Sequence, residues 1–149
     1  MGDLRADRSI DIDAPLDEVY AIIADLETTP EWQNAMISID VIERDGEGRP
    51  ELVEIVSDAK VKQVKNKMRF SYQPPDGMSW VQEKGDMKSL EGSWGLEDLG
   101  GDRTRAVYSL RGDPGRMLGM LLRGPVEDKV KEFLTKDSVE GLKSRAESG

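Results

Sequence analysis

The chain has 149 residues, a formal net charge of −9, and neither histidine nor cysteine. This length suits one domain, 1–149, which can bury about 70% of its unfolded surface in a core. The missing residue types exclude Ser-His and Cys-His catalysis and the usual zinc sites, so we expect no metal or cofactor. The acidic charge disfavours binding to nucleic acids and to anionic lipid surfaces, because both need a positive field.

No part of the sequence predicts insertion into a membrane or export. No window approaches the ~20 apolar residues of a membrane span. The first residues, MGDLRADRS, lack the apolar run of a signal peptide. Without cysteine, nothing indicates disulfides or secretion. We therefore expect a cytoplasmic protein with no integral membrane association.

The hydrophobic spacing changes abruptly at the dipeptide Ala14-Pro15. Before it, Ile10 and Ile12 alternate with polar residues, which is typical of a strand with one buried face. After it, apolar residues recur every three or four positions over 16–26, as in an amphipathic helix. Proline is tolerated in a first helical turn, because its missing N–H has no partner there. Thr28–Pro30 are then expected to end this helix.

Six further strands are predicted in the middle of the chain. Apolar and polar residues alternate along them, and turn-forming runs such as Pro74–Gly77 and Gly100–Asp102 separate them. Consecutive strands with short links predict an antiparallel meander rather than a parallel α/β sheet. The residues expected to face inward are Ile37, Ile39, Val41, Val53, Ile55, Ser57, Ala59, Val61, Val64, Asn66, Met68, Phe70, Tyr72, Trp80, Gln82, Leu90, Trp94, Leu96, Ala106, Tyr108 and Leu110.

The last third of the chain returns to helical spacing. Asp113 is a candidate N-cap, with Pro114 at the first helical position. The proline of Gly124-Pro125 removes one backbone hydrogen bond, so we expect a kink or two helical segments there. The segment Met117–Leu122 is apolar on almost every side, which predicts that it is buried, lines a cavity or contacts a partner.

Two sets of motifs follow one another along nearly the whole chain. The first is Ile12-Asp13-Ala14-Pro15, Glu18-Val19-Tyr20, Asp25-Leu26 and Pro30-Glu31-Trp32; the second is Gly92-Ser93-Trp94-Gly95-Leu96-Glu97 and then Gly100-Gly101-Asp102-Arg103-Thr104-Arg105. Together they resemble the SRPBCC superfamily, also called START-like or polyketide cyclase/dehydrase-like proteins. The resemblance implies an α+β helix-grip fold: a seven-stranded curved antiparallel sheet wrapped around a long C-terminal helix, with two short helices between strands 1 and 2. It also implies an internal cavity between the sheet and that helix.

The candidate ligand-binding residues are those expected around this cavity. For each of the three tryptophans alone, a place in the core is the simpler interpretation. Their spread over separate elements, beside several methionines, is also what an apolar ligand chamber needs. The candidates are Trp32, Met36, Ile55, Ser57, Asn66, Met68, Phe70, Trp80, Gln82, Trp94, Tyr108, Met117 and Leu121.

Functions of different classes remain open at this point. The first is binding of a hydrophobic small molecule (a lipid, a polyketide or an isoprenoid-like compound) by burial in the cavity. The alternative is a cyclase/dehydrase-type enzyme that acts by orienting its substrate, and the missing histidine favours binding over catalysis. A third is an interaction module, such as a homodimer packed through Met117–Leu122. The sequence specifies neither the ligand nor the oligomeric state, monomer or homodimer, and we assign no catalytic residue.

Overall fold

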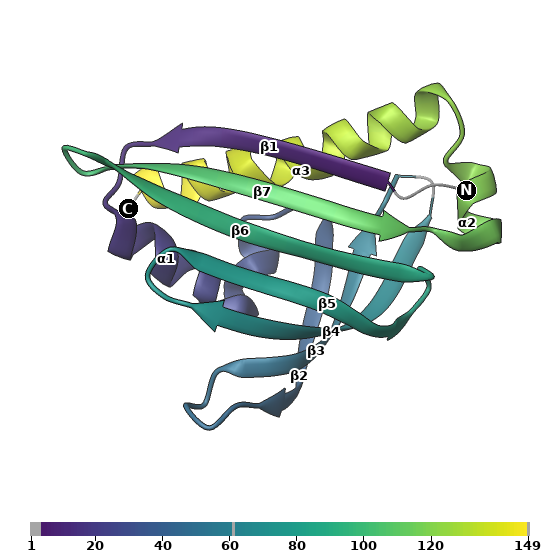
Figure 1. Cartoon of the computed structure of the whole chain (residues 1–149), viewed down its shortest axis with the longest axis horizontal. Helices are drawn as coiled ribbons and strands as arrows, with labels where there is room; N and C mark the ends of the chain where they lie inside the picture. Colours follow the sequence, from purple (N-terminus) through teal and green to yellow (C-terminus); the bar gives the residue numbers. More distant parts are fainter. Residues whose placement is uncertain (1–3, 61, 149) are drawn as a thin grey trace.

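The computed structural model describes residues 4–60 and 62–148, and in it one antiparallel sheet curves around a long C-terminal helix (Figure 1). Its elements are β1 (Leu4–Ile12), α1 (Leu16–Ala24), η1 (Leu26–Glu31), β2 (Met36–Arg44), β3 (Pro50–Asp58), β4 (Gln63–Gln73), β5 (Gly77–Gly85), β6 (Ser89–Gly100), β7 (Arg103–Asp113), α2 (Gly115–Leu121) and α3 (Pro125–Glu147). The seven strands lie in the order β1-β7-β6-β5-β4-β3-β2. This is the α+β helix-grip fold that the sequence motifs imply.

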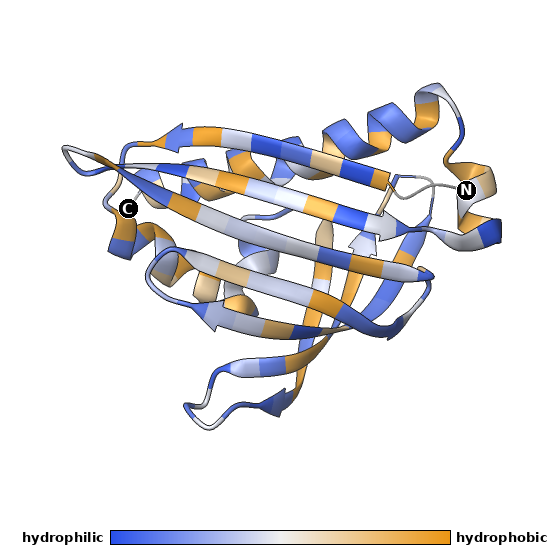
Figure 2. Cartoon of the chain, viewed as in Figure 1, coloured by the Kyte–Doolittle hydropathy of each residue, from blue (hydrophilic) through white to orange (hydrophobic). Residues whose placement is uncertain are grey.

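The N-terminal elements follow the predicted change of period, with small differences at their ends. Hydrophobic residues are separated by hydrophilic ones along β1 (Figure 2), and Ile12 is fully buried. Pro15 is the N-cap of α1 rather than a residue of its first turn. The run Thr28–Pro30 lies inside the 3₁₀ helix η1 and does not follow the helical region. The chain therefore has two short helices between β1 and β2.

In strand β2, one side chain departs from the predicted alternation of inward and outward residues. Its pairing with β3 shifts register between Met36 and Ser38, as in a β-bulge. A bulge inserts an extra residue and so reverses the alternation of faces. Met36 consequently packs against the core, whereas Ile37 is exposed and the prediction for it is wrong. Val61, which was expected inward, lies outside the described residues.

The inward faces of β4 to β7 agree with the predicted alternation. Met68, Phe70, Trp94 and Tyr108 are all buried in the main core. Gly92 of β6 has a steric role in this core, because a Cβ atom there would lie 2.5 Å from the indole ring of Trp80 on β5. The absence of a side chain at Gly92 therefore leaves room for that ring beside the neighbouring strand.

The C-terminal region forms two helical segments, one of the two expected outcomes. α2 ends at Leu121 and α3 begins at Pro125, where the missing N–H has no helical partner to lose. Gly124 between them has φ +57°, a left-handed conformation that favours glycine. The Asp113 carboxylate accepts a hydrogen bond from the Gly115 N–H at 2.9 Å, although Pro114 occupies the N-cap position itself.

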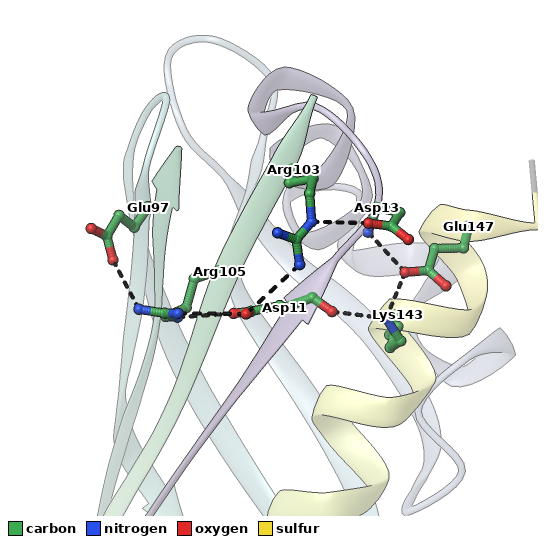
Figure 3. Close-up of polar contacts among 7 residues, drawn as sticks. All are labelled: Asp11, Asp13, Glu97, Arg103, Arg105, Lys143 and Glu147. Carbon is green, nitrogen blue, oxygen red and sulfur yellow. Dashed lines mark hydrogen bonds and ion pairs between the residues drawn. The ribbon is translucent and has the colours of Figure 1, made fainter. Parts of the chain in front are cut away.

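The C-terminal end of α3 is tied to the end of β1 by a polar network (Figure 3). The Lys143 ammonium donates to the Asp11 carbonyl oxygen at 2.8 Å and to the Glu147 carboxylate at 2.7 Å. The same Glu147 oxygen accepts the Asp13 N–H at 2.8 Å. This network holds the long helix against the sheet.

Among the described residues, no helix is both long and apolar enough to cross a membrane.

Candidate functional site

A cavity of about 180 Å³ lies between the inner face of the sheet and the helices. Its walls come from α1, η1, α2, α3 and all seven strands, so it occupies the space that a curled sheet and one helix leave unfilled. A dry apolar cavity of about 150 Å³ can hold benzene. The cavity is somewhat larger than that, so it has room for one or two small fused rings or a short apolar chain.

Most of the candidate residues line this cavity. They reach it because inward positions on neighbouring strands face the same side of a sheet. Those in the wall are Trp32, Met36, Ile55, Ser57, Asn66, Met68, Phe70, Trp80, Trp94 and Tyr108. The structure thus brings together side chains from the η1–β2 connection and from β2 to β7.

Three candidate residues do not line the cavity. The Gln82 amide donates to the Met87 carbonyl oxygen at 2.9 Å, which holds this side chain at the β5–β6 turn. Met117 and Leu121 of α2 are exposed to solvent, whereas Leu118 of α2 and Leu122, which follows the helix, are buried and line the wall. The prediction that Met117 and Leu121 face the cavity is therefore wrong, because the segment turns Leu118 and Leu122 inward instead.

Aromatic rings form a continuous part of the wall. The rings of Trp94 and Tyr108 have centroids 4.7 Å apart, and Trp80 lies 5.9 Å from Tyr108. Trp32 and Phe70 extend the cluster at 6.3 Å from Trp94 and 5.4 Å from Trp80. Tilted pairs at these distances stabilise one another beyond the area that they bury. The rings on this side of the cavity are therefore packed against one another, and they present faces and edges to an occupant.

A short hydrogen-bonded chain places a phenol hydroxyl at the cavity. The Gln33 amide donates to Ser138 Oγ at 2.6 Å and to the Tyr108 hydroxyl at 3.5 Å, and Ser138 donates to the Leu134 carbonyl at 2.8 Å. Burial raises the pKa of Tyr108 above its ordinary value, so the phenol stays neutral at pH 7. Tyr108 can therefore donate a hydrogen bond at neutral pH but does not act as a base.

Three further polar atoms are buried in the cavity wall. Thr29 Oγ1, Trp32 Nε1 and Asn66 Oδ1 have no hydrogen-bond partner among the described residues. A buried polar group without a partner costs about 1–3 kcal/mol. The set contains an N–H donor on Trp32, an oxygen acceptor on Asn66 and a hydroxyl on Thr29. A ligand that carries both a hydrogen-bond acceptor and a hydroxyl would therefore satisfy these groups.

Several residues of the cavity wall were not among the candidates predicted from the sequence. Thr29 and Gln33 belong to η1 and the turn after it, where neither a period of two nor a period of 3.6 marks an inward face. Val130 and Leu134 of α3 also line the wall, and neither was among the candidate residues. The one feature of the sequence that could have indicated a place for Thr29 and Gln33 in the wall is their nearness to Trp32.

Charged side chains lie at the end of the cavity beside α2. Arg5 of β1, Arg111 of β7 and Lys131 of α3 line it there, where these elements converge (Figure 1). Lys131 pairs with Glu127 at 3.5 Å, one helical turn away. This end is therefore charged, whereas the rest of the wall is mostly apolar, and we call it the mouth of the cavity. In the described ranges, no group of three His, Cys, Asp or Glu side chains is placed to hold a metal ion.

Solved structures of similar fold come from several bacteria. A START superfamily protein from Mycobacterium smegmatis has a TM-score of 0.85 at 17% identity, with 99% of each chain covered. The protein TTHA0849 from Thermus thermophilus has a TM-score of 0.81 at 25% identity, covering 99% of this chain and 98% of the other. The ZhuI aromatase/cyclase from Streptomyces sp. R1128 has a TM-score of 0.82 at 17% identity, covering 98% and 94%. These similarities show the fold.

Sequence comparison assigns the family. No curated protein matches the chain. The family model described as polyketide cyclase / dehydrase and lipid transport matches residues 12–136, which include every strand from β2 to β7 and about half of α3. The chain therefore belongs to the polyketide cyclase/dehydrase and lipid transport family, within the SRPBCC or START-like fold group.

Proposed function

We propose that this protein binds an apolar small molecule of lipid, polyketide or isoprenoid-like character in the cavity between the sheet and α3. The observation that carries the proposal is the cavity itself, with its aromatic and methionine wall. Burial of apolar ligand area contributes about 25 cal/mol per Å², which must exceed the entropy lost on binding. Prepacked rings reduce that loss, because they need little ordering when the ligand enters.

The buried polar atoms favour a ligand that carries oxygen over a plain hydrocarbon. Trp32 Nε1–H and the Tyr108 hydroxyl can donate to a carbonyl or hydroxyl oxygen, and Asn66 Oδ1 can accept from a hydroxyl group. A site that hydrogen-bonds a substrate discriminates strongly against analogues without the matching group. The preferred ligand is therefore a small oxygenated ring compound or an oxygenated short chain.

The alternative function is a cyclase or dehydrase reaction in the same cavity. The neutral Tyr108 phenol supports it, because such a group can polarise a carbonyl while the walls orient a reactive chain. The ZhuI protein of similar fold is an aromatase/cyclase, which supports this alternative. Binding ranks first, because the carboxylate among the lining residues, Glu127, is paired with Lys131 at the mouth and so is poorly placed to act as a base.

Tryptophan fluorescence tests the binding proposal directly. The chain has three tryptophans, and all three line the cavity, so an occupant should change their emission. Titration with 2-naphthol and with naphthalene should give saturable changes, with tighter binding of 2-naphthol. Mass spectrometry of an extract from native protein should identify a co-purified apolar compound. If no apolar compound binds or raises the melting temperature, the binding proposal is wrong.

The enzyme alternative has a separate test. Tyr108→Phe removes the hydroxyl but keeps the ring in the aromatic wall. If the protein is a cyclase, this variant loses turnover of a poly-ketone substrate and keeps its affinity for naphthalene. Unchanged turnover contradicts a role for Tyr108 in proton transfer.

A further inference from the structure

The short helix α2 turns large apolar side chains toward solvent. Met117, Met120 and Leu121 are 82%, 60% and 47% exposed, and we call these three residues the α2 patch. Large apolar side chains that gather on a surface mark a site of interaction with a protein or a membrane. The opposite side of the same segment contributes Leu118 and Leu122 to the cavity wall. The helix α2 and Leu122, which follows it, therefore lie between part of the cavity and the solvent.

The charge around the patch differs in sign from that of the whole chain. Residues 113–131 contain four basic and three acidic side chains, a balance of +1, while the chain carries −9 in total. Of the acids, Asp113 lies 3.8 Å from Lys88 and Glu127 lies 3.5 Å from Lys131, so both are partly neutralised. Arg116 and Arg123 are exposed, and neither forms an ion pair with a described residue. Because exposed charges are screened beyond about 8 Å at physiological salt, distant carboxylates affect this region weakly. The local surface therefore complements an anionic apolar partner.

The shape of this region favours a bilayer over a second copy of the chain. α2 lies at one end of the molecule, with orange, hydrophobic residues in its turns (Figures 1 and 2). The α2 patch offers three apolar side chains to a two-fold dimer, which are few for a stable interface that buries roughly 1,000 Å² or more. Such a dimer would also bring the arginines of both copies together. A lipid surface, in contrast, accepts a few apolar side chains in its headgroup region and pairs arginines with phosphates.

We propose that α2 docks on anionic lipid bilayers. Met117, Met120 and Leu121 enter the boundary between headgroups and acyl chains, and Arg116 and Arg123 contact lipid phosphates. Since Leu118 and Leu122 line the cavity, docking brings its mouth to the membrane, where apolar ligands are concentrated. The docking stands independently of the proposed function, whereas the transfer of a ligand at the membrane rests on it.

Co-sedimentation with vesicles tests the docking. The wild-type chain should bind vesicles of equimolar phosphatidylcholine and phosphatidylglycerol, and bind more weakly as salt rises. Arg116→Gln and Arg123→Gln should each lower the partition coefficient about fivefold. Met117→Ser combined with Met120→Ser should lower it about tenfold or more. These side chains are exposed, so circular dichroism should show unchanged folding.

Matched controls separate the patch from general surface properties. Ile42→Ser with Val81→Ser removes apolar side chains that are 46% and 50% exposed on strands away from α2, and vesicle binding should not change. Arg44→Gln with Arg103→Gln removes exposed charges at the β2–β3 and β6–β7 turns and should have equally little effect. The proposal is overturned if the wild type does not bind the vesicles, or if the α2 variants bind as the wild type does. A dimer that the methionine variant dissolves would also overturn it, in favour of a second copy.

The vesicle experiment and the ligand titration fail independently. Fluorescence titration without vesicles tests the cavity alone. Vesicle binding without any ligand binding would support the docking and contradict the proposed function.

Discussion

Gly141 of α3 lies directly against the backbone carbonyl of Trp32, and a Cβ atom at position 141 would be 1.9 Å from that oxygen. Trp32 is one of the aromatic residues of the cavity wall. The close approach of α3 to the end of η1 therefore depends on a residue without a side chain. This contact fixes both the position of the long helix and one wall of the cavity.

Gly141→Ala should destabilise the protein, although alanine is the better helix former by about 1 kcal/mol. The clash is with backbone, which yields less readily than the end of a side chain, so overpacking should cost about 1–3 kcal/mol net or more. Urea denaturation measures this change. Gly46→Ala is the control, because nothing lies within 4 Å of its Cβ position. Equal stability of the wild type and the Gly141 variant would contradict the described packing of α3.

Acidification should loosen the C-terminal end of α3. The Asp13 N–H and the Lys143 ammonium hold the pKa of Glu147 below its ordinary value of 4.5. A lowered pKa in the folded state means that Glu147 contributes fully to stability above its unfolded pKa. The contribution is lost as pH falls through the lower, folded-state pKa. Stability should therefore decline below about pH 4.5.

Glu147→Gln should reduce this acid dependence, and Glu140→Gln, at an exposed position of the same helix, should not. Thermal unfolding between about pH 3 and pH 7 provides the measurement. An identical acid slope in the wild type and in Glu147→Gln would contradict the assigned role of the network.

The outer face of the sheet offers a test of salt dependence. Arg69 of β4 pairs with Glu51 and Glu83, and it lies 3.6 Å from Glu43, so carboxylates from β2, β3 and β5 surround one guanidinium. Arg69→Gln leaves these three acids facing one another and should lower the melting temperature. Added salt should recover part of that loss, because it screens repulsion between exposed charges. A melting temperature that is independent of salt in the variant would contradict this account.

Trp32→Phe should change ligand preference more than it changes folding. Its Nε1–H has no hydrogen-bond partner among the described residues, so its removal sacrifices no such bond in the free protein. The variant should bind 2-naphthol about tenfold less tightly relative to naphthalene, the effect of one hydrogen bond of about 1.4 kcal/mol. Trp80→Phe, which removes an indole from the same wall, serves as the control. An unchanged ratio of the two dissociation constants in Trp32→Phe would show that Nε1 does not contact the ligand.

The residues on regular strands could be predicted from the sequence, because a strand has a strict period of two. This period placed Asn66, Trp80 and Tyr108 inward, and the cavity wall contains all three. Ile37 violated the pattern because a register shift beside it reverses the faces, and a bulge leaves no clear mark in a run such as MISIDV. Strand patterns alone therefore predict the sheet better than its local irregularities.

The helical parts of the site were harder to predict for a different reason. Met117–Leu122 is apolar on nearly every side, so no polar face shows which side chains turn inward, and the structure selects Leu118 and Leu122. Thr29 belongs to a 3₁₀ helix that is too short for a periodic signal. Long-range packing against α3 and the strands decides these orientations, and that packing is not encoded in local spacing.

Nuclear magnetic resonance of the ¹⁵N-labelled protein during titration with 2-naphthol tests the central claim most directly. The indole N–H signals of Trp32, Trp80 and Trp94 report from inside the cavity, while the amides of Gly46 and Gly48 in the β2–β3 turn, which does not line the cavity, serve as references. The account predicts saturable shifts of the indole signals, the largest at Trp32, with the references unchanged. Indole signals that stay in place at saturating probe, or shifts confined to the outer face, would contradict it.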